Sequence, residues 1–187
     1  MEQERGKRLF LAICFPEEVK TELSDRAALL REGAFKGNFT RRENFHLTLA
    51  FLGQTGRQRE VERLMERLNF PNFSLTLAGF GRFRGKQGDV WWMGVKENGM
   101  LSALQSLLQR ELLELGFTLD RRAYRPHVTL GRGVVLSSRT AGEDALGPLP
   151  PIDVPVREFV LMESKRDDGT LRYIPLFSRA LQSGENE

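Results

Sequence analysis

Only two of the 187 residues are histidines, and both open the same kind of four-residue phrase. The phrases are HLTL, which begins at His46, and HVTL, which begins at His127. Side chains alternate between the two faces of a β-strand, so each histidine and the threonine two residues later should look the same way. The opposite face of the first strand should carry Leu47, Leu49 and Phe51, where a core can cover them. Each phrase therefore predicts a strand that offers an imidazole and a hydroxyl to a cleft.

Two imidazoles that face each other suit in-line displacement at a phosphate. A neutral histidine takes a proton from the attacking oxygen, and a protonated histidine gives one to the leaving oxygen. With an ordinary pKa near 6.5, histidine supplies both forms close to neutral pH. Because the two oxygens lie on opposite sides of phosphorus, we expect the ring nitrogens to be roughly 5–7 Å apart. Thr48 and Thr129 would donate hydrogen bonds to the non-bridging oxygens.

Other chemistries find less support in the sequence. A single histidine in a strand is usually structural, but two at matching sites favour a shared role. Zinc needs three or four close ligands, whereas no third histidine exists and Cys14 is far away in sequence. A carboxylate-only metal site stays open, and no GxSxG nucleophile motif is present. The glycine-rich segment 79–88 lacks a nucleotide-binding pattern and favours a hairpin turn, although its Arg82, Arg84 and Lys86 could contact an RNA backbone.

The elements that must position the histidines also recur, with the same spacing of 81 residues. A strand-like run, a helical pattern, the histidine strand and a further strand-like run occur twice, over 7–15, 16–31, 46–53 and 73–83, and then over 89–96, 101–115, 127–132 and 154–164. The first half adds a helix over 61–68, and Asp167-Asp168-Gly169 predicts a C-terminal hairpin turn. We therefore predict an α+β fold with two pseudo-two-fold-related lobes, each a mostly antiparallel sheet with outer helices, and an active-site cleft between them.

Composition sets the remaining bounds. A length of 187 residues with 40% hydrophobic residues allows one domain over 1–187, with pseudo-repeat halves at about 7–83 and 89–178. The sequence pI of about 9.3 suits a phosphate-bearing partner, and it equally suits an ordinary solvated surface. One lone cysteine and the lack of an apolar run near 18 residues predict a protein of a reducing cytoplasm without a membrane span. We expect a monomer.

The paired HxTL phrases, the run HLTLAFLG from His46 and the run PHVTLGR from Pro126 together resemble the 2H phosphoesterase superfamily. The most similar branch is the RNA 2′,3′-cyclic phosphodiesterases, long called 2′-5′ RNA ligases. The resemblance covers essentially the whole chain. It implies a cofactor- and metal-free hydrolase that opens a terminal 2′,3′-cyclic phosphate on RNA to a 2′-phosphate. It also implies that His46 is the proton donor, that His127 is the proton acceptor, and that Thr48 and Thr129 bind phosphate.

The same resemblance assigns Arg132 to the phosphate, but a regular strand would point it away from His127, five residues earlier. A bulge at Gly131 could turn it back into the cleft. The sequence gives a weaker indication of which residues recognise the base. Tyr124 and Phe15 are the aromatic side chains that we expect to bind substrate. Further candidates for stacking or phosphate contact, most of which equally suit the core or the solvated surface, are Phe45, Trp91, Trp92, Arg122 and Arg125.

Rival functions remain within and beyond this family. The cleft could act on another cyclic or 2′-5′ linked nucleotide, or run in reverse as a 2′-5′ RNA ligase, although opening a strained ring in water favours hydrolysis. A non-catalytic module that binds RNA ends is a third possibility, and the intact histidines and threonines argue against it.

Overall fold

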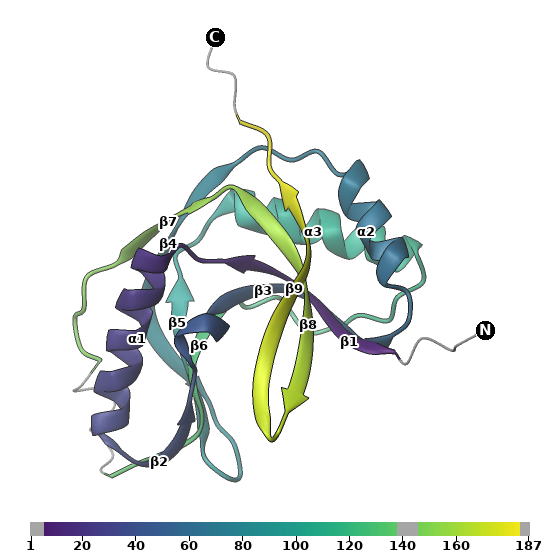
Figure 1. The fold of residues 1–187 in the computed structure, drawn as a ribbon. Helices are drawn as coiled ribbons and strands as arrows, with labels where there is room; N and C mark the ends of the chain where they lie inside the picture. The colour runs from purple at the N-terminus through teal and green to yellow at the C-terminus, as the bar shows by residue number, and fades with distance from the viewer. Residues whose placement is uncertain (1–5, 138–145, 184–187) are drawn as a thin grey trace.

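Two antiparallel sheets form the framework of the chain in the computed structural model, which describes residues 6–137 and 146–183 (Figure 1). The elements, in chain order, are β1 (Lys7–Cys14), α1 (Glu17–Glu32), β2 (Ala34–Phe39), the 3-10 turn η1 (Arg42–Asn44), β3 (His46–Thr55), α2 (Gln58–Arg67), β4 (Phe73–Phe83), β5 (Asp89–Val95), α3 (Gly99–Glu114), β6 (His127–Leu136), β7 (Ile152–Val156), β8 (Glu158–Asp167) and β9 (Thr170–Ala180). The predicted first strand, all three helices and both histidine strands are therefore confirmed.

The two halves of the chain exchange strands. One sheet has the order β3-β1-β8-β9 and the other the order β2-β6-β5-β4-β7, with every neighbouring pair antiparallel. Strand β4 of the first half thus lies beside β5, and β8 of the second half lies beside β1. The orders β3-β1-β8 and β6-β5-β4 contain equivalent strands of the repeat, so the two-fold relation survives the exchange. The α+β class with two antiparallel sheets is confirmed.

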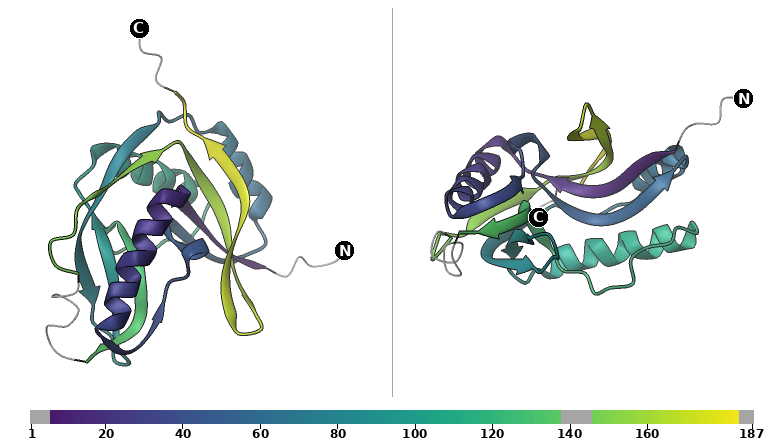
Figure 2. Two further views of the ribbon diagram at one scale, coloured as in Figure 1. Left: turned by 60° about the vertical axis from the view of Figure 1, so that its left-hand side comes forward. Right: turned by 90° about the horizontal axis from the view of Figure 1, so that it is seen from below.

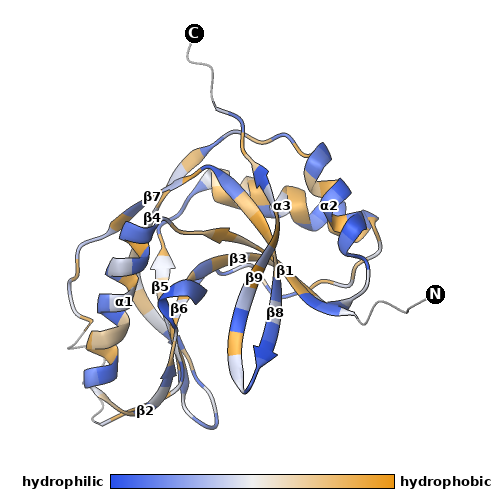
Figure 3. Ribbon diagram, viewed as in Figure 1, coloured by the Kyte–Doolittle hydropathy of each residue, from blue (hydrophilic) through white to orange (hydrophobic). Residues whose placement is uncertain are grey.

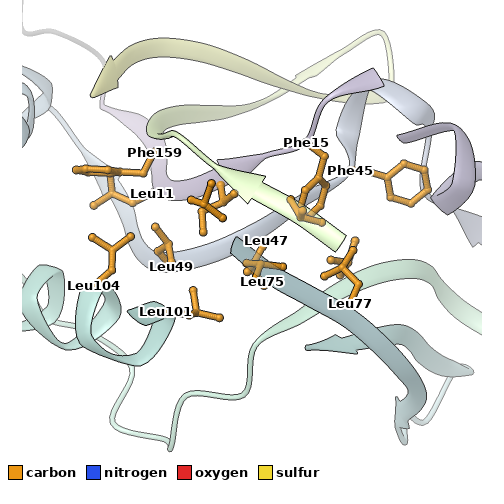
Figure 4. Packing of buried hydrophobic residues seen from close by; sticks show 14 of the residues in the cluster. Leu11, Phe15, Phe45, Leu47, Leu49, Leu75, Leu77, Leu101, Leu104 and Phe159 are labelled. Atoms are coloured by element: carbon orange, nitrogen blue, oxygen red, sulfur yellow. The ribbon is translucent and has the colours of Figure 1, made fainter. Parts of the chain in front are cut away.

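The helices pack against both sheets and share one core with them. Helix α1 contacts β2, β6 and β7, whereas α3 contacts β3 of the other sheet (Figure 2). Figure 3 shows that α3 is mainly hydrophobic and that α2 carries many hydrophilic residues, as expected for a helix with one face in water. Most of the buried side chains form one large cluster, which includes Leu11, Leu47, Leu77, Leu104 and Phe159 (Figure 4). A second, smaller cluster contains Phe10, Ala12, Val160 and Met162. This shared core fixes the two histidine strands relative to each other.

Three details differ from the sequence-based expectation. The run over 154–164 forms two strands, because Arg157 separates β7, which pairs with β4, from β8, which pairs with β1. Strand β2 at the edge of the larger sheet was not anticipated, since AFKGNF lacks a clear apolar alternation. The C-terminal hairpin is confirmed but longer than expected. Asp168 and Gly169 both adopt positive φ, at 48° and 78°, as a tight two-residue turn requires.

Candidate active site

The two histidines occupy equivalent places, each as the first residue of its strand. In both cases Nδ1 lies at hydrogen-bond distance from the carbonyl oxygen two residues earlier, at 2.8 Å from Asn44 for His46 and 2.7 Å from Arg125 for His127. Strands β3 and β6 belong to different sheets, yet they contact each other. The fold therefore brings the two strands that begin with histidine together.

This hydrogen bond determines which ring nitrogen is available for chemistry. A carbonyl oxygen only accepts, so Nδ1 must carry the proton in the neutral ring and Nε2 holds the lone pair. Nε2 of His46 lies 3.1 Å from Oγ1 of Thr48, the threonine of its own HxT phrase. The same carbonyl also stabilises the ring when it is doubly protonated, since Nδ1 donates in both states. Each histidine can therefore give or take a proton at Nε2 without turning.

Aromatic rings hold each imidazole in place. Phe10 and Tyr173 pack against His46 with ring centroids 5.0 and 4.8 Å away. Phe83 lies 5.1 Å from the ring of His127 and meets it edge to face. The sequence analysis did not identify these three aromatic residues, because their neighbourhood is set by strand pairing between distant parts of the chain.

Asn44 is a further positioning residue that sequence reasoning missed. Its side chain is buried, donates to the Leu171 carbonyl at 3.0 Å and accepts from the Tyr173 backbone N–H at 3.3 Å. Its own carbonyl accepts from His46. Asn44 therefore links the turn before β3 to β9, and it sets the position of both His46 and the ring packed on it.

The surroundings favour neutral imidazoles in the free protein. Burial, together with the positive charges of Arg132 and His127, lowers the pKa of His46 from 6.5 to about 4, although the Asn44 carbonyl opposes this effect. Burial also lowers the pKa of His127, and Arg132 contributes in the same direction. The guanidinium of Arg132 thus acts on both histidines at once. The charge of Arg132 makes the free site positive, so the site would attract an anion.

A β-bulge explains how Arg132 reaches the histidines. Thr129 pairs with Trp92, and Gly131 pairs with Trp91, so Leu130 is an extra residue on β6. One extra residue reverses the alternation that follows it, and Arg132 then shares the face of Thr129, whose Oγ1 lies 3.5 Å from its Nη2. The bulge suspected at Gly131 is therefore present one residue earlier, and the geometric objection to Arg132 is removed.

The other histidine strand carries the same bulge, and this overturns the prediction for Phe51. Thr48 pairs with Ala12 and Ala50 with Leu11, so Leu49 is the extra residue. Leu47 and Leu49 are buried as predicted, but Phe51 is 57% exposed and lies outside the core. The bulges at Leu49 and Leu130 are 81 residues apart, so they belong to the repeat.

A cavity of about 620 Å³ opens beside His127 and Thr48. Thr48 and Phe51 line it from one sheet, and Phe83 and His127 line it from the other. The α3–β6 connection closes its far side with Tyr124 and other residues, among which are Leu119, Asp120, Arg122 and Arg125. The cavity therefore begins at the HxT phrases and extends toward α3.

The aromatic candidates separate into two groups. Phe15 was expected to bind substrate, but it is only 4% exposed and packs in the core, so it offers no face to a base. Phe45 and Trp91 are also buried in the core. Tyr124 lines the cavity, yet its hydroxyl donates to the Thr48 carbonyl at 2.9 Å, and burial raises its pKa. Tyr124 is thus a link between the α3–β6 connection and β3.

Within the described residues, no group of three or more His, Cys, Asp or Glu side chains is arranged to hold a metal ion. The expectation of metal-independent chemistry stays a prediction. None of the helices in the described part of the chain is long and apolar enough to cross a membrane.

The two-sheet fold and the paired HxT strands define a class, and comparison with known proteins identifies it. The chain belongs to the 2′-5′ RNA ligase superfamily, whose family model matches residues 15–168. A Thermotoga maritima protein named RNA 2′,3′-cyclic phosphodiesterase is 36% identical over 162 residues, which cover 84% of this chain and 86% of the relative. An Escherichia coli protein of the same name is 32% identical over 182 residues, which cover 94% and 97%.

Solved structures show the same likeness. The crystal structure of Escherichia coli LigT complexed with 3′-AMP superposes with a TM-score of 0.73 at 29% sequence identity. The match covers 94% of this chain and 98% of that protein. The fold described above is therefore that of LigT over nearly its entire length.

Proposed function

We propose that this protein hydrolyses the 2′,3′-cyclic phosphate at the end of an RNA strand and leaves a 2′-phosphate. The observation that carries the proposal is the pair of Nδ1-anchored histidines on strands that contact each other, with Arg132 close enough to lower the pKa of both. The names of the Thermotoga maritima and Escherichia coli relatives give the same activity. The Escherichia coli LigT complex with 3′-AMP supports a nucleotide as the ligand.

In the proposed reaction, a water molecule attacks phosphorus while Nε2 of His127 takes its proton. The bond between phosphorus and O3′ breaks on the opposite side, and Nε2 of His46 gives a proton to O3′. One P–O bond forms and one breaks, so the product is a 2′-phosphomonoester with a free 3′-hydroxyl. Thr48, Thr129 and Arg132 would stabilise the charge that builds on the non-bridging oxygens.

The low pKa of His46 has to be reconciled with its role as donor. In the free protein, a pKa of about 4 leaves the ring neutral at pH 7. A bound cyclic phosphate brings a negative charge next to the imidazole and offsets that of Arg132, which favours the protonated ring. Substrate binding would therefore charge the donor, and the site would be set for proton transfer only when phosphate is present.

Product analysis tests this proposal. The protein is incubated in EDTA with an oligonucleotide that ends in a 2′,3′-cyclic phosphate, and the product is identified by phosphorus NMR. We expect turnover without added metal and a single product, the 2′-phosphate. A 3′-phosphate or an even mixture would reverse or remove the assigned roles of His46 and His127. Activity that requires Mg²⁺, Mn²⁺ or Zn²⁺ would contradict the metal-free mechanism.

The proposal also covers the binding partner, the oligomeric state, the cellular location and the domain organisation of the protein. The partner is an RNA end, and we propose that the protein works as a monomer in the cytoplasm. The interleaved strands, with β4 beside β5 and β8 beside β1, support a single domain whose pseudo-repeat halves cannot be separated. Gel filtration and partial proteolysis test the monomer and the single domain, because a dimer or two stable fragments would contradict them.

A further inference from the structure

Strand β2 lies directly beside the part of β6 that carries Thr129 and Arg132. Asn38 of β2 pairs with Arg132, and residues that lie opposite each other on two strands project from the same face of the sheet. Just beyond β2, the hydroxyl of Thr40 donates to the carbonyl of Thr129 at 2.8 Å. β2 is also an edge strand of the larger sheet. It therefore forms the border between the proposed phosphate site and the outer surface of the protein.

The most exposed large hydrophobic side chain of the described residues lies on this strand. It is Phe35, which is 80% exposed. Ala34 pairs with Leu136, and Lys36 pairs with Val135. Phe35 is therefore an extra residue on β2, which the ladder leaves unpaired. A phenyl ring in water costs free energy unless something covers it, so this bulge presents a ring that a ligand could cover.

Phe35 lines a second cavity, of about 420 Å³, which also carries positive charge. Its cations are Arg31 near the end of α1, Lys36 on β2 and Arg41 just after β2, and all three are exposed. In residues 6–137 and 146–183, no carboxylate lines this cavity, and no ion pair involves these cations. The cavity thus combines an aromatic ring with three cations, and its volume lies in the range of small-molecule sites.

We propose that this β2 cavity binds the RNA strand itself, at nucleotides upstream of the one that carries the cyclic phosphate. The inference rests on the proposed function. Because the cyclic phosphate is the 3′ end of the RNA, the rest of the strand has to leave the cleft past one of its walls, and β2 is the wall beside Arg132. Phe35 is three residues from Asn38, or about 10 Å along a strand, so a short stretch of RNA can reach both places.

The residue types of the β2 cavity match this ligand. The three cations neutralise backbone phosphates, and Phe35 stacks on a base. Proteins that hold single strands without reading their sequence combine these two contacts, because every nucleotide has a charged backbone and a flat base. The β2 cavity therefore favours an RNA end over a free mononucleotide, whatever the sequence of the RNA.

A pair of substrates separates strand binding from chemistry. Adenosine 2′,3′-cyclic phosphate has no upstream nucleotide, whereas a short single-stranded oligoadenylate with the same cyclic end has several. For Phe35→Ala, we expect KM for the oligonucleotide to rise by roughly 5- to 150-fold, the range that loss of one stacked base implies. The kinetics with the mononucleotide should stay the same, which also shows that the variant folds. Phe35→Tyr should keep the wild-type KM, and Phe35→Leu, which has no ring, should not.

The salt dependence tests the cations. Each phosphate contact on a single strand contributes about 0.7 to the slope of log(kcat/KM) against log[salt]. The double variant Lys36→Gln, Arg41→Gln should therefore make the slope for the oligonucleotide shallower by about 1.4. Arg63→Gln, Arg67→Gln is the matched control, because both arginines are exposed on α2, which lies across the molecule from β2 (Figure 1, Figure 2). An equal change in the control would show that net charge acts rather than the β2 cavity, and would overturn the inference.

A binding measurement keeps this test separate from the proposed function. A labelled oligoadenylate that ends in a 2′-phosphate is titrated by fluorescence anisotropy against the wild type, Phe35→Ala and both double variants. If the wild type hydrolyses neither cyclic compound, the proposed function fails, and weaker binding by Phe35→Ala and by Lys36→Gln, Arg41→Gln, but not by the control, still supports the RNA site. If the wild type is active and these variants bind the oligonucleotide as it does, or lose the same activity on both substrates, only the RNA site fails.

Discussion

Replacing His46 by asparagine should make the protein less sensitive to acid. The pKa of His46 falls from 6.5 in the unfolded chain to about 4 in the folded one, so the folded state binds this proton less readily than the unfolded state. Protonation therefore favours unfolding, and the stability present above pH 6.5 is lost as the pH falls toward 4. Each unit of pKa difference corresponds to about 1.4 kcal/mol. The expected loss from this one group is about 2 kcal/mol at pH 5 and about 3 kcal/mol at pH 4.

Urea unfolding at pH 7.5, 5 and 4 measures this effect. The free energy of unfolding of His46→Asn should fall less than that of the wild type, by the amounts given above, whatever its value at pH 7.5. Carboxylates such as Asp120, whose pKa is lowered to about 2 by its hydrogen bonds with Arg122, contribute equally to both proteins and cancel. His127→Asn should reduce the acid sensitivity in the same direction. Parallel curves for the wild type and His46→Asn would refute the burial of a neutral His46.

Three further predictions concern catalysis and the fold around it. The pH profile of kcat/KM should be a bell whose centre lies below pH 6.5, because the pKa values of both histidines are lowered in the free protein. The acidic limb reports the protonation of the general base, and the basic limb reports the deprotonation of the general acid. A flat profile from pH 4 to 9 would contradict paired histidines. Arg132→Gln should lower kcat/KM by about 10- to 100-fold through the lost charged hydrogen bonds. It should also shift the pH profile of kcat/KM to higher pH, because a positive charge is removed beside both histidines. An unshifted profile would place Arg132 outside the site. Tyr124→Phe should lower the free energy of unfolding by about 1–2 kcal/mol, since the Thr48 carbonyl loses its donor, and urea unfolding that matches the wild type would show that this link is unimportant.

The site could be predicted from the sequence because the two scarce histidines occur in matching phrases. His46 and His127, with their threonines, mark both strands because nothing else in the chain repeats so distinctly. The exchange of strands between the two halves could not be predicted, because a strand such as β4 has the same alternation of apolar and polar residues whichever sheet it joins. Aromatic contacts such as that between Tyr173 and His46 depend on this exchange, so they could not be inferred either.

The bulges show where the simple alternation of a strand fails. Phe51 was assigned to the core because it is two residues beyond Leu49, and an uninterrupted strand would bury both. A signal was present in the spacing of the leucines, since Leu49 and Leu52 are three residues apart, and no regular strand places such a pair on one face. Both are buried in the structure. The prediction that Phe15 binds substrate was wrong for a different reason. From the sequence alone, an aromatic residue at the end of a strand and next to Pro16 suits a cleft and a core equally well.

The most direct test of the account is the turnover of the two single histidine variants. His46→Ala and His127→Ala should each lower kcat on a 2′,3′-cyclic-phosphate oligonucleotide by about 10² to 10⁴, which is the usual value of a positioned general acid or base. Both variants should keep the wild-type circular dichroism spectrum at room temperature. Turnover near that of the wild type in either folded variant would contradict the central claim that the two histidines share the proton transfers.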